Sequence, residues 1–365
     1  MSWFIIIFFI ISIALLLITK YYLLQKELFI EQLETFENDS NTTPSDKLFK
    51  DHGIRIKYLD SIEASSLIVK NGEYFKGMNQ ANLSARGCVS IDELYTKYKQ
   101  AFDNITDQEK LIVDTFILNL LIEIKNTSST SSTYYNYVIK WLKTISIAKA
   151  KHWLESGMPH TLDTTIVMDS DWFINPRKTT FLHEITHIHQ RQSPLDFEDL
   201  YPLLGYYYNP VDIKGLESIY PLNRNNPDGM DKYWLWKSRD NKDLITYWWI
   251  GAIFNTAIPH SLGDINMMAL KLDSDSSNGS EGNDSNKIFY YLKQNPTKLS
   301  NLKEFTNFFG DNPNNYHPNE MTAKFSEWFL MEKIKGINNN NNYDYNYEGY
   351  KIYKKYFENM LNKYY

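Results

Sequence analysis

One helix constrains the fold of this chain more than any other segment. Phe181, Ile185 and Ile188 recur at the spacing of an apolar helix face. Asn175-Pro176 predicts an N-cap followed by a proline at the first helical position, and Ser193-Pro194 predicts the end of the helix. We therefore expect a helix between these two prolines, with one face buried in a core.

The same helix carries the pattern His183-Glu184-Ile185-Thr186-His187, an HExxH motif. A helix turns by about 100° per residue, so the two histidines lie about 40° apart on one face. Both imidazoles can then reach one zinc ion while Glu184 lies beside them. Such an ion activates a bound water and polarises a carbonyl group, and Glu184 is the expected general base and not a metal ligand.

The surroundings of the motif resemble those of a known group of enzymes. Thr164 to Met168 is short and β-branched, and Asp169-Ser170-Asp171 supplies turn residues before the helix. This order of strand, turn and metal-binding helix resembles that of the HExxH metallopeptidases called zincins. Among them, the gluzincins take a third zinc ligand from a glutamate on a second, downstream helix.

Residues 317–325 resemble the Asn-Glu-x-x-small signature of thermolysin-like gluzincins, and this resemblance implies that Glu320 is the third zinc ligand. Ala323 would let two helices approach closely. The resemblance departs from the family pattern at Lys324, where the family has an aspartate that orients a ligand histidine. The residues alone leave three alternative third ligands open, namely Glu217, Asp264 and His317.

A group that stabilises the developing oxyanion is also required. The sequence leaves five candidates for it, which are Tyr206, Tyr207, Tyr208, Tyr247 and His260. His189 projects about 200° away from His187 on the helix, so we expect it to be a partly buried, hydrogen-bonded residue. The remaining isolated histidines lack ligand spacing and are expected to be surface or structural residues: His52, His152 and His160.

The amino terminus predicts attachment to a membrane. Trp3 to Thr19 contains no charged residue and has the length of a short membrane span. A cleaved signal peptide is the alternative, but no Lys or Arg precedes the apolar segment and no small-residue cleavage site follows it. We therefore predict an uncleaved, single-pass transmembrane anchor whose orientation stays open.

Composition limits the class of partner. The formal net charge is −6 and the basic residues form no stripe, which argues against a nucleic-acid partner. Hydrophobic residues make up 43% of the chain, enough for a sizeable core. Cys88 is the single cysteine, so an intramolecular disulfide is excluded.

The predicted fold class is α+β and zincin-like, mainly helical, with a small sheet before the HExxH helix and an N-terminal transmembrane anchor. A capping box at Thr106 to Glu109 predicts a helix to about Lys125, and further helices are expected at 134–154 and 350–365. The expected order is anchor 1–22, polar stalk 23–47, mainly helical N-terminal lobe 48–160, metal-binding catalytic region 161–336, and Asn-rich loop with C-terminal helix 337–365.

These patterns favour a membrane-anchored, zinc-dependent metallopeptidase that hydrolyses peptides or proteins. Zinc is the expected cofactor, held by His183, His187 and Glu320, with Glu184 as the catalytic base. Two alternatives remain open: a catalytically inactive, zincin-like, membrane-tethered binding protein, and a zinc hydrolase of a non-peptide substrate. The intact motif favours an enzyme over an inactive scaffold.

Overall fold

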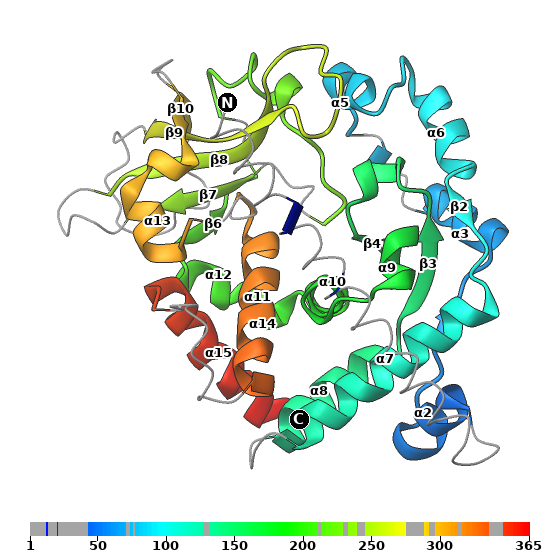
Figure 1. Cartoon of the computed structure of the whole chain (residues 1–365). Helices are drawn as coiled ribbons and strands as arrows, with labels where there is room; N and C mark the ends of the chain where they lie inside the picture. The colour runs from blue at the N-terminus through cyan, green and yellow to red at the C-terminus, as the bar shows by residue number, and fades with distance from the viewer. Residues whose placement is uncertain are drawn as a thin grey trace.

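Helices and two separate β-sheets build the described part of the chain (Figure 1). The computed structural model describes residues 12–13, 20, 43–70, 74–75, 77–126, 131–210, 213–228, 233–238, 245–274, 288–291, 296–311, 316–335 and 346–365.

The α-helices are α2 (Pro44–His52), α3 (Ser61–Lys70), α5 (Gln80–Ala85), α6 (Ile91–Lys99), α7 (Asp107–Asn126), α8 (Ser131–Leu142), α9 (Ser170–Ile174), α10 (Lys178–Gln192), α11 (Leu195–Glu198), α12 (Leu200–Leu203), α13 (Lys303–Phe309), α14 (Pro318–Lys335) and α15 (Glu348–Tyr364). Short 3₁₀ helices are η1 (Leu154–Gly157), η2 (Tyr220–Leu222) and η4 (Leu299–Asn301).

Sheet A leads the chain into the HExxH helix. Its strands are β1 (Lys57–Tyr58), β2 (Phe102–Asp103), β3 (Ser146–Ala150), β4 (His160–Leu162) and β5 (Thr165–Asp169), in the order β1-β3-β5-β4 with β2 beside β3. The strands β1, β3 and β5 are parallel. Along β5, Ile166 and Met168 enter the core around α7, α8 and α10, whereas Val167 enters the core on the opposite face. Both faces are therefore buried, which explains the continuous apolar runs of these strands.

Sheet B is an antiparallel meander in the second half of the chain. Its strands are β6 (Tyr206–Tyr208), β7 (Trp234–Lys237), β8 (Tyr247–Phe254), β9 (Ile265–Ser274), β10 (Phe289–Tyr291) and β11 (Thr297–Lys298), in the order β10-β9-β8-β7-β6 with β11 beside β9. Side chains alternate along β8: Ile250 and Ala252 join the core shared with α10, and Trp249 and Ile253 join a second core.

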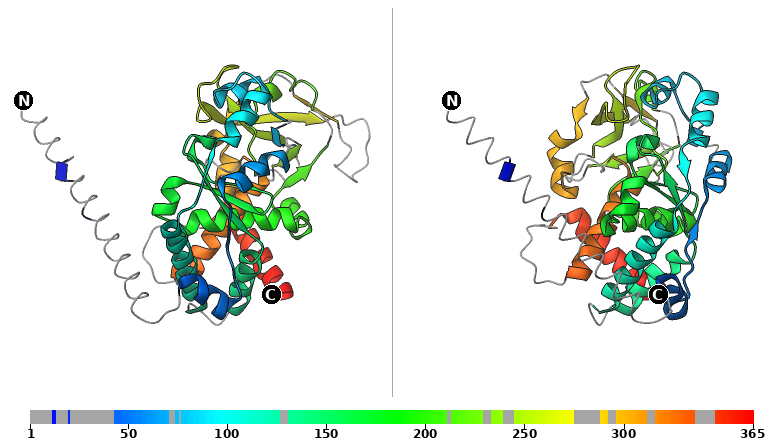
Figure 2. Two further views of the ribbon diagram at one scale, coloured as in Figure 1. Left: turned by 90° about the vertical axis from the view of Figure 1, so that its right-hand side faces the viewer. Right: turned by 45° about the vertical axis from the view of Figure 1, so that its right-hand side comes forward.

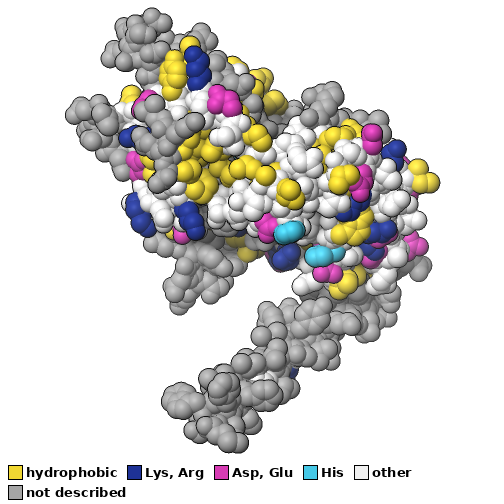
Figure 3. All heavy atoms as spheres, turned by 90° about the horizontal axis from the view of Figure 1, so that it is seen from above, with side chains coloured by type: hydrophobic (Ala, Val, Ile, Leu, Met, Phe, Trp, Pro, Cys, Tyr) yellow, Lys and Arg dark blue, Asp and Glu magenta, His cyan; other side chains and the backbone are white. Residues whose placement is uncertain are grey.

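The HExxH helix lies between these parts. Seen nearly end-on in Figure 1, α10 has sheet A on one side and α14 and sheet B on the other. In the turned views of Figure 2, sheet B stays above α10, and α7 and α8 stay below it. From above, hydrophobic side chains gather over one half of the surface, and the visible histidines lie in the other half among acidic and basic side chains (Figure 3).

The predicted fold class, mainly helical with a small sheet before the HExxH helix, is wrong. The chain is a mixture of helices and two sheets, of five and six strands. The helix predicted at 134–154 ends at Leu142, and its last part is β3, the strand at the centre of sheet A. The aromatic segments after the HExxH helix, for which no sheet was predicted, pair as sheet B.

The N-terminal anchor predicted at 1–22 lies outside the described residues, except for Ser12, Ile13 and Lys20. None of the helices within the described ranges is long and apolar enough to cross a membrane. The Asn-rich tract at 338–342 also lies outside these ranges.

Several local predictions are confirmed. The strand expected at 164–168 is β5, and the capping box at Thr106 and Glu109 opens α7, with both reciprocal hydrogen bonds present. The expected C-terminal helix is α15. In each case the sequence pattern is local, although β5 pairs with β3 and α15 packs against α13 and α14.

A buried ion pair ties the first half of the chain to the loop above the HExxH helix. Both side chains of the pair, Arg86 and Glu155, are 4% exposed, and Arg86 Nη2 lies 2.8 Å from Glu155 Oε2. The same nitrogen donates to the Asn225 carbonyl at 3.2 Å. Asn82 holds the same loop by donating to Asn223 O and accepting from Asn225 N, each at 2.8 Å.

We predict that Arg86→Leu destabilises the fold by about 3–5 kcal/mol, because the buried carboxylate of Glu155 would lose its charged partner. Urea unfolding followed by circular dichroism measures the effect. Lys57→Ala is the control, since it breaks the exposed pair with Glu63 and should change the free energy of unfolding little. Equal midpoints for Arg86→Leu and wild type would show that the buried pair does not stabilise the fold.

Candidate metal centre

The helix α10 holds the HExxH residues in its buried middle. Every residue from Phe181 to Gln190 is buried, and the predicted apolar face lies in the core shared with α7 and α8. The helix ends at the predicted place, with Ser193 as its C-cap. The predicted start at Asn175-Pro176 is wrong. Asp169 caps the short helix α9, so Asn175 ends α9 and α10 begins at Lys178.

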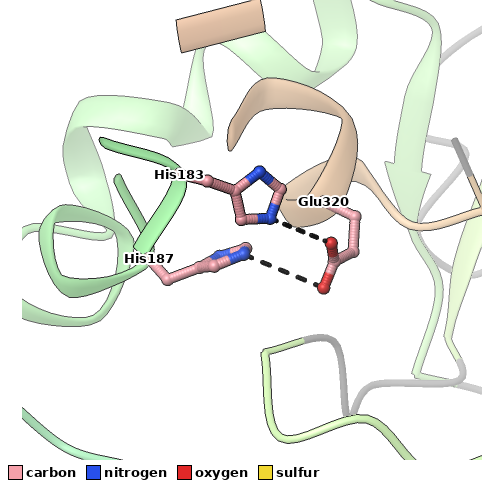
Figure 4. A group of neighbouring side chains, drawn as sticks. All are labelled: His183, His187 and Glu320. Atoms are coloured by element: carbon pink, nitrogen blue, oxygen red, sulfur yellow. Dashed lines mark hydrogen bonds and ion pairs between the residues drawn. The ribbon is translucent and has the colours of Figure 1, made fainter. Parts of the chain in front are cut away.

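Helix α14 brings a carboxylate to the two imidazoles. It begins at Pro318, a favoured first helical residue, and Glu320 lies in its first turn. Figure 4 shows the side chains of His183 and His187 pointing toward Glu320. Nε2 of His183 lies 3.3 Å from Glu320 Oε2, and Nε2 of His187 lies 3.8 Å from Glu320 Oε1.

These distances fit a metal ion. Bonds of about 2.0–2.2 Å to a tetrahedral zinc ion separate the ligand atoms by roughly 3.4 Å. The ligand atoms of His183, His187 and Glu320 all lie within 4.8 Å of one another, and all three residues are buried. In addition, Nε2 of His187 is buried and has no hydrogen-bond partner within the described residues. The buried histidine and glutamate side chains can therefore hold a metal ion.

The other ring nitrogen of each histidine is held by an acceptor. His183 Nδ1 is hydrogen-bonded to Glu327 Oε1 at 2.9 Å, and His187 Nδ1 to Gln190 Oε1 at 2.7 Å. These bonds direct both Nε2 atoms toward Glu320 and make the rings better metal ligands. Sequence reasoning missed Glu327, although it lies seven residues after Glu320 and hence on the same face of α14.

Lys324 does not replace the orienting aspartate of the family pattern. Its ammonium group lies 2.7 Å from Glu327 Oε2, the second oxygen of the carboxylate that holds His183. The orienting carboxylate is present in this chain, but it lies one turn further along α14 than Lys324.

Glu184 lines the same cavity as His183 and Glu320. It is 3% exposed, and its Oε2 has no hydrogen-bond partner among the residues that the structure describes. Burial raises the pKa of Glu184 well above its usual range, and the charges of Asp228 and Glu320 act in the same direction. The carboxylate is thus placed to accept a proton.

The electrostatics of the cluster favour positive charge. Burial opposes protonation of His183, yet hydrogen bonds to Glu320 and Glu327 raise the pKa of His183 well above its usual range. Burial would also raise the pKa of Glu320, but the hydrogen bond with His183 and the charges of both imidazoles lower it to about 2. A cation is therefore stabilised between these side chains.

Asp228 adds a fourth carboxylate that the sequence patterns do not indicate. Glu184, His187 and Asp228 form a second buried group that can hold a metal ion, and it shares His187 with the first group. Asp228 accepts hydrogen bonds from the backbone and hydroxyl of Thr161, and Arg191 Nη2 lies 3.0 Å from its Oδ1. Only the first group contains both histidines, so we expect it to bind the ion.

Two of the five predicted candidates for oxyanion stabilisation, Tyr247 and His260, lie away from the cluster. Tyr247 lies in the second core of sheet B, and the backbone N–H of His260 donates to Asp264 in an exposed loop. The residues that line one cavity with Glu184 and Glu320 are instead Arg224 and Tyr316. Arg224 Nη2 lies 3.3 Å from the Tyr316 hydroxyl. Burial raises the pKa of Tyr316 to about 12, so its hydroxyl keeps a proton to donate at neutral pH.

The alternative third ligands lie outside the cluster. Asp264 accepts backbone hydrogen bonds from residues 260 and 261, and Glu217 accepts one from Gly215. His317 lines a neighbouring cavity, where its Nδ1 accepts from Asn319 N at 3.2 Å.

The remaining histidines have structural or surface positions. His189 is hydrogen-bonded, as predicted, with Nε2 at 2.9 Å from Asp196, but it is fully and not partly buried, and its ring is stacked on Trp141. His52 is hydrogen-bonded to Tyr135, and His160 to the Met158 carbonyl. His152 belongs to a third, more exposed group with Asp169 and Asp171. Exposed groups of this kind are common without an ion.

Two cavities meet at the cluster. The smaller, of about 220 Å³, is lined by His183, Glu184 and Glu320, and the larger, of about 620 Å³, is lined by His187. Pro227 and Asp228 belong to the walls of both. The ligand cluster is therefore reached from two sides.

No family model, curated protein or solved structure matched this chain.

We predict that Glu327→Gln weakens zinc binding by about 10–100-fold, because a neutral amide holds the His183 ring less firmly and makes it a poorer ligand. Competition against a chromophoric chelator measures the affinity. Glu332→Gln is the matched control: it makes the same change on α14, where Glu332 pairs with Lys354 and does not contact the ligands. If both variants bind zinc as tightly as wild type, Glu327 does not support the site.

Proposed function

We propose that this protein is a zinc-dependent metallopeptidase of the gluzincin type. The observation that carries the proposal is the buried cluster in which His183, His187 and Glu320 converge while Glu184 stays beside them with a free carboxylate oxygen. Two imidazoles and one carboxylate are a common ligand set for catalytic zinc. When bound, such an ion lowers the pKa of a water molecule and polarises a carbonyl oxygen.

Glu184 is the proposed general base. Its position in the smaller cavity, between Glu320 and Asp228, puts its carboxylate next to the ligand atoms without making it part of the cluster. It would take a proton from the attacking water and return it to the leaving amine. Burial supports this role, because the raised pKa of Glu184 favours transfer of a proton to its carboxylate.

Arg224 and Tyr316 are the proposed stabilisers of the oxyanion. Both line the smaller cavity, and Tyr316 is held in place by Arg224 and by Asn226, which also donates to Glu320 Oε1 at 2.6 Å. A fixed hydroxyl and a guanidinium that need not reorganise are effective where negative charge develops.

We predict that Glu184→Gln retains zinc and lowers the rate of peptide hydrolysis by roughly 10²–10⁴-fold, because the amide cannot accept the proton. Metal analysis and cleavage of a mixed peptide library by the full chain test this. The paired variant His183→Ala should lose both zinc and activity. Loss of zinc from Glu184→Gln would place the ion in the second group, with His187 and Asp228.

We also predict that Tyr316→Phe lowers kcat by about 10²–10³-fold and leaves the zinc content unchanged, since it removes one hydrogen-bond donor. The matched control is Tyr58→Phe, which removes a hydroxyl that donates to Asp114 and lines neither cavity. Equal loss in the two variants would argue against a specific role of Tyr316.

A further inference from the structure

The larger cavity has a composition unlike that of the metal cluster beside it. Its volume is about 620 Å³, within the range of pockets that bind medium-sized ligands. Six of the residues in its wall are aromatic: Phe197, Tyr201, Tyr206, Tyr207, Tyr208 and Trp234. Three charged side chains also line it: Arg191 and Asp228, which are paired with each other at 3.0 Å, and the exposed Glu198.

The aromatic rings form a connected wall. Tyr201 and Tyr208 both meet Trp234 edge-on, with ring centroids 5.0 and 5.4 Å apart. Phe197 packs beside Tyr201 at 5.9 Å. Phe197 and Tyr201 are buried, whereas Tyr208 is 44% exposed, so the wall extends from the interior to the surface.

This wall is fixed to the start of α14. The Tyr201 hydroxyl donates to Asn319 Oδ1 at 2.7 Å, and Asn319 Nδ2 donates to the Asp228 carbonyl at 3.1 Å. Asn319 immediately precedes Glu320, and His187 completes the same cavity. A side chain that enters the cavity would therefore lie next to the ligand cluster.

We propose that this cavity binds an aromatic side chain adjacent to the scissile bond of the peptide substrate, and this inference rests on the proposed function. Rings prefer the edge-to-face and offset contacts that the wall offers, and an apolar occupant is favoured because the two charged groups nearest the cluster already neutralise each other. A small side chain would leave the rings without contacts. An acidic side chain would lose its hydration on entering the cavity.

Matched peptides test the proposal on the zinc-loaded, full-length protein. The peptides are identical except that one of the two residues flanking the scissile bond is Trp, Phe, Leu, Ala or Asp. The preference for Phe or Trp over Ala in kcat/KM should be about 10–200-fold at one of the two positions, the usual range for filling an apolar pocket. Cleavage with no such preference at either position would overturn the proposal.

Binding separates this inference from the proposed function. The zinc-loaded Glu184→Gln variant should bind the Phe peptide more tightly than the Ala peptide in calorimetry. If the wild type cleaves nothing but this difference remains, the peptidase proposal fails and the aromatic pocket stands. If the Phe and Ala peptides bind equally, the pocket proposal fails.

A substitution of Tyr208, at the rim of the larger cavity, tests the role of the aromatic wall. Because Tyr208 is partly exposed, Tyr208→Ala should fold, and it should lower kcat/KM for the Phe peptide by a larger factor than for the Ala peptide. Tyr208→Phe should restore the preference, since the ring supplies the contact. Tyr364→Ala, which removes an exposed tyrosine from α15 outside the cavity, should change neither value. Equal effects of Tyr208→Ala on both peptides would contradict the proposed role of the wall.

Discussion

The packing of α10 against α14 is the contact on which the whole site depends. It joins two segments that are distant in the sequence and places Glu320 and Glu327, two helical turns apart, on the two ring nitrogens of His183. One helix thus supplies both a candidate metal ligand and the group that orients another ligand. Sheet A sets the start of α10 through β5 and α9, and sheet B provides the wall of the larger cavity.

The second constraint is charge. Four carboxylates, those of Glu184, Asp228, Glu320 and Glu327, surround two imidazoles, and each of these acidic residues is at most 7% exposed. Uncompensated carboxylates are costly in such surroundings. Arg191 pairs with Asp228, and Lys324 pairs with Glu327. The oxygens of Glu320, in contrast, face the imidazole nitrogens directly. A metal ion at these atoms would balance the charge, and this charge balance supports the proposal that the cluster binds a metal ion.

The parts of the site that sequence can predict are those encoded within one element. His183, Glu184 and His187 follow from spacing on a single helix, whereas Glu320 follows only from resemblance, because nothing in the intervening residues shows that the two helices meet. Asp228 follows from neither, since it lies in a loop whose position depends on tertiary contacts with Thr161 and Arg191. Sheet B was missed for the same reason, because it is defined only by the pairing of strands that are separated in the sequence.

Zinc-edge anomalous diffraction from crystals of the zinc-loaded protein tests most directly whether His183, His187 and Glu320 hold one zinc ion. We expect one anomalous peak within bonding distance, about 2.0–2.2 Å, of His183 Nε2, His187 Nε2 and a Glu320 oxygen, with Glu184 outside that distance. A peak bonded instead to Glu184, His187 and Asp228, or no peak in the cluster at saturating zinc, would contradict this expectation.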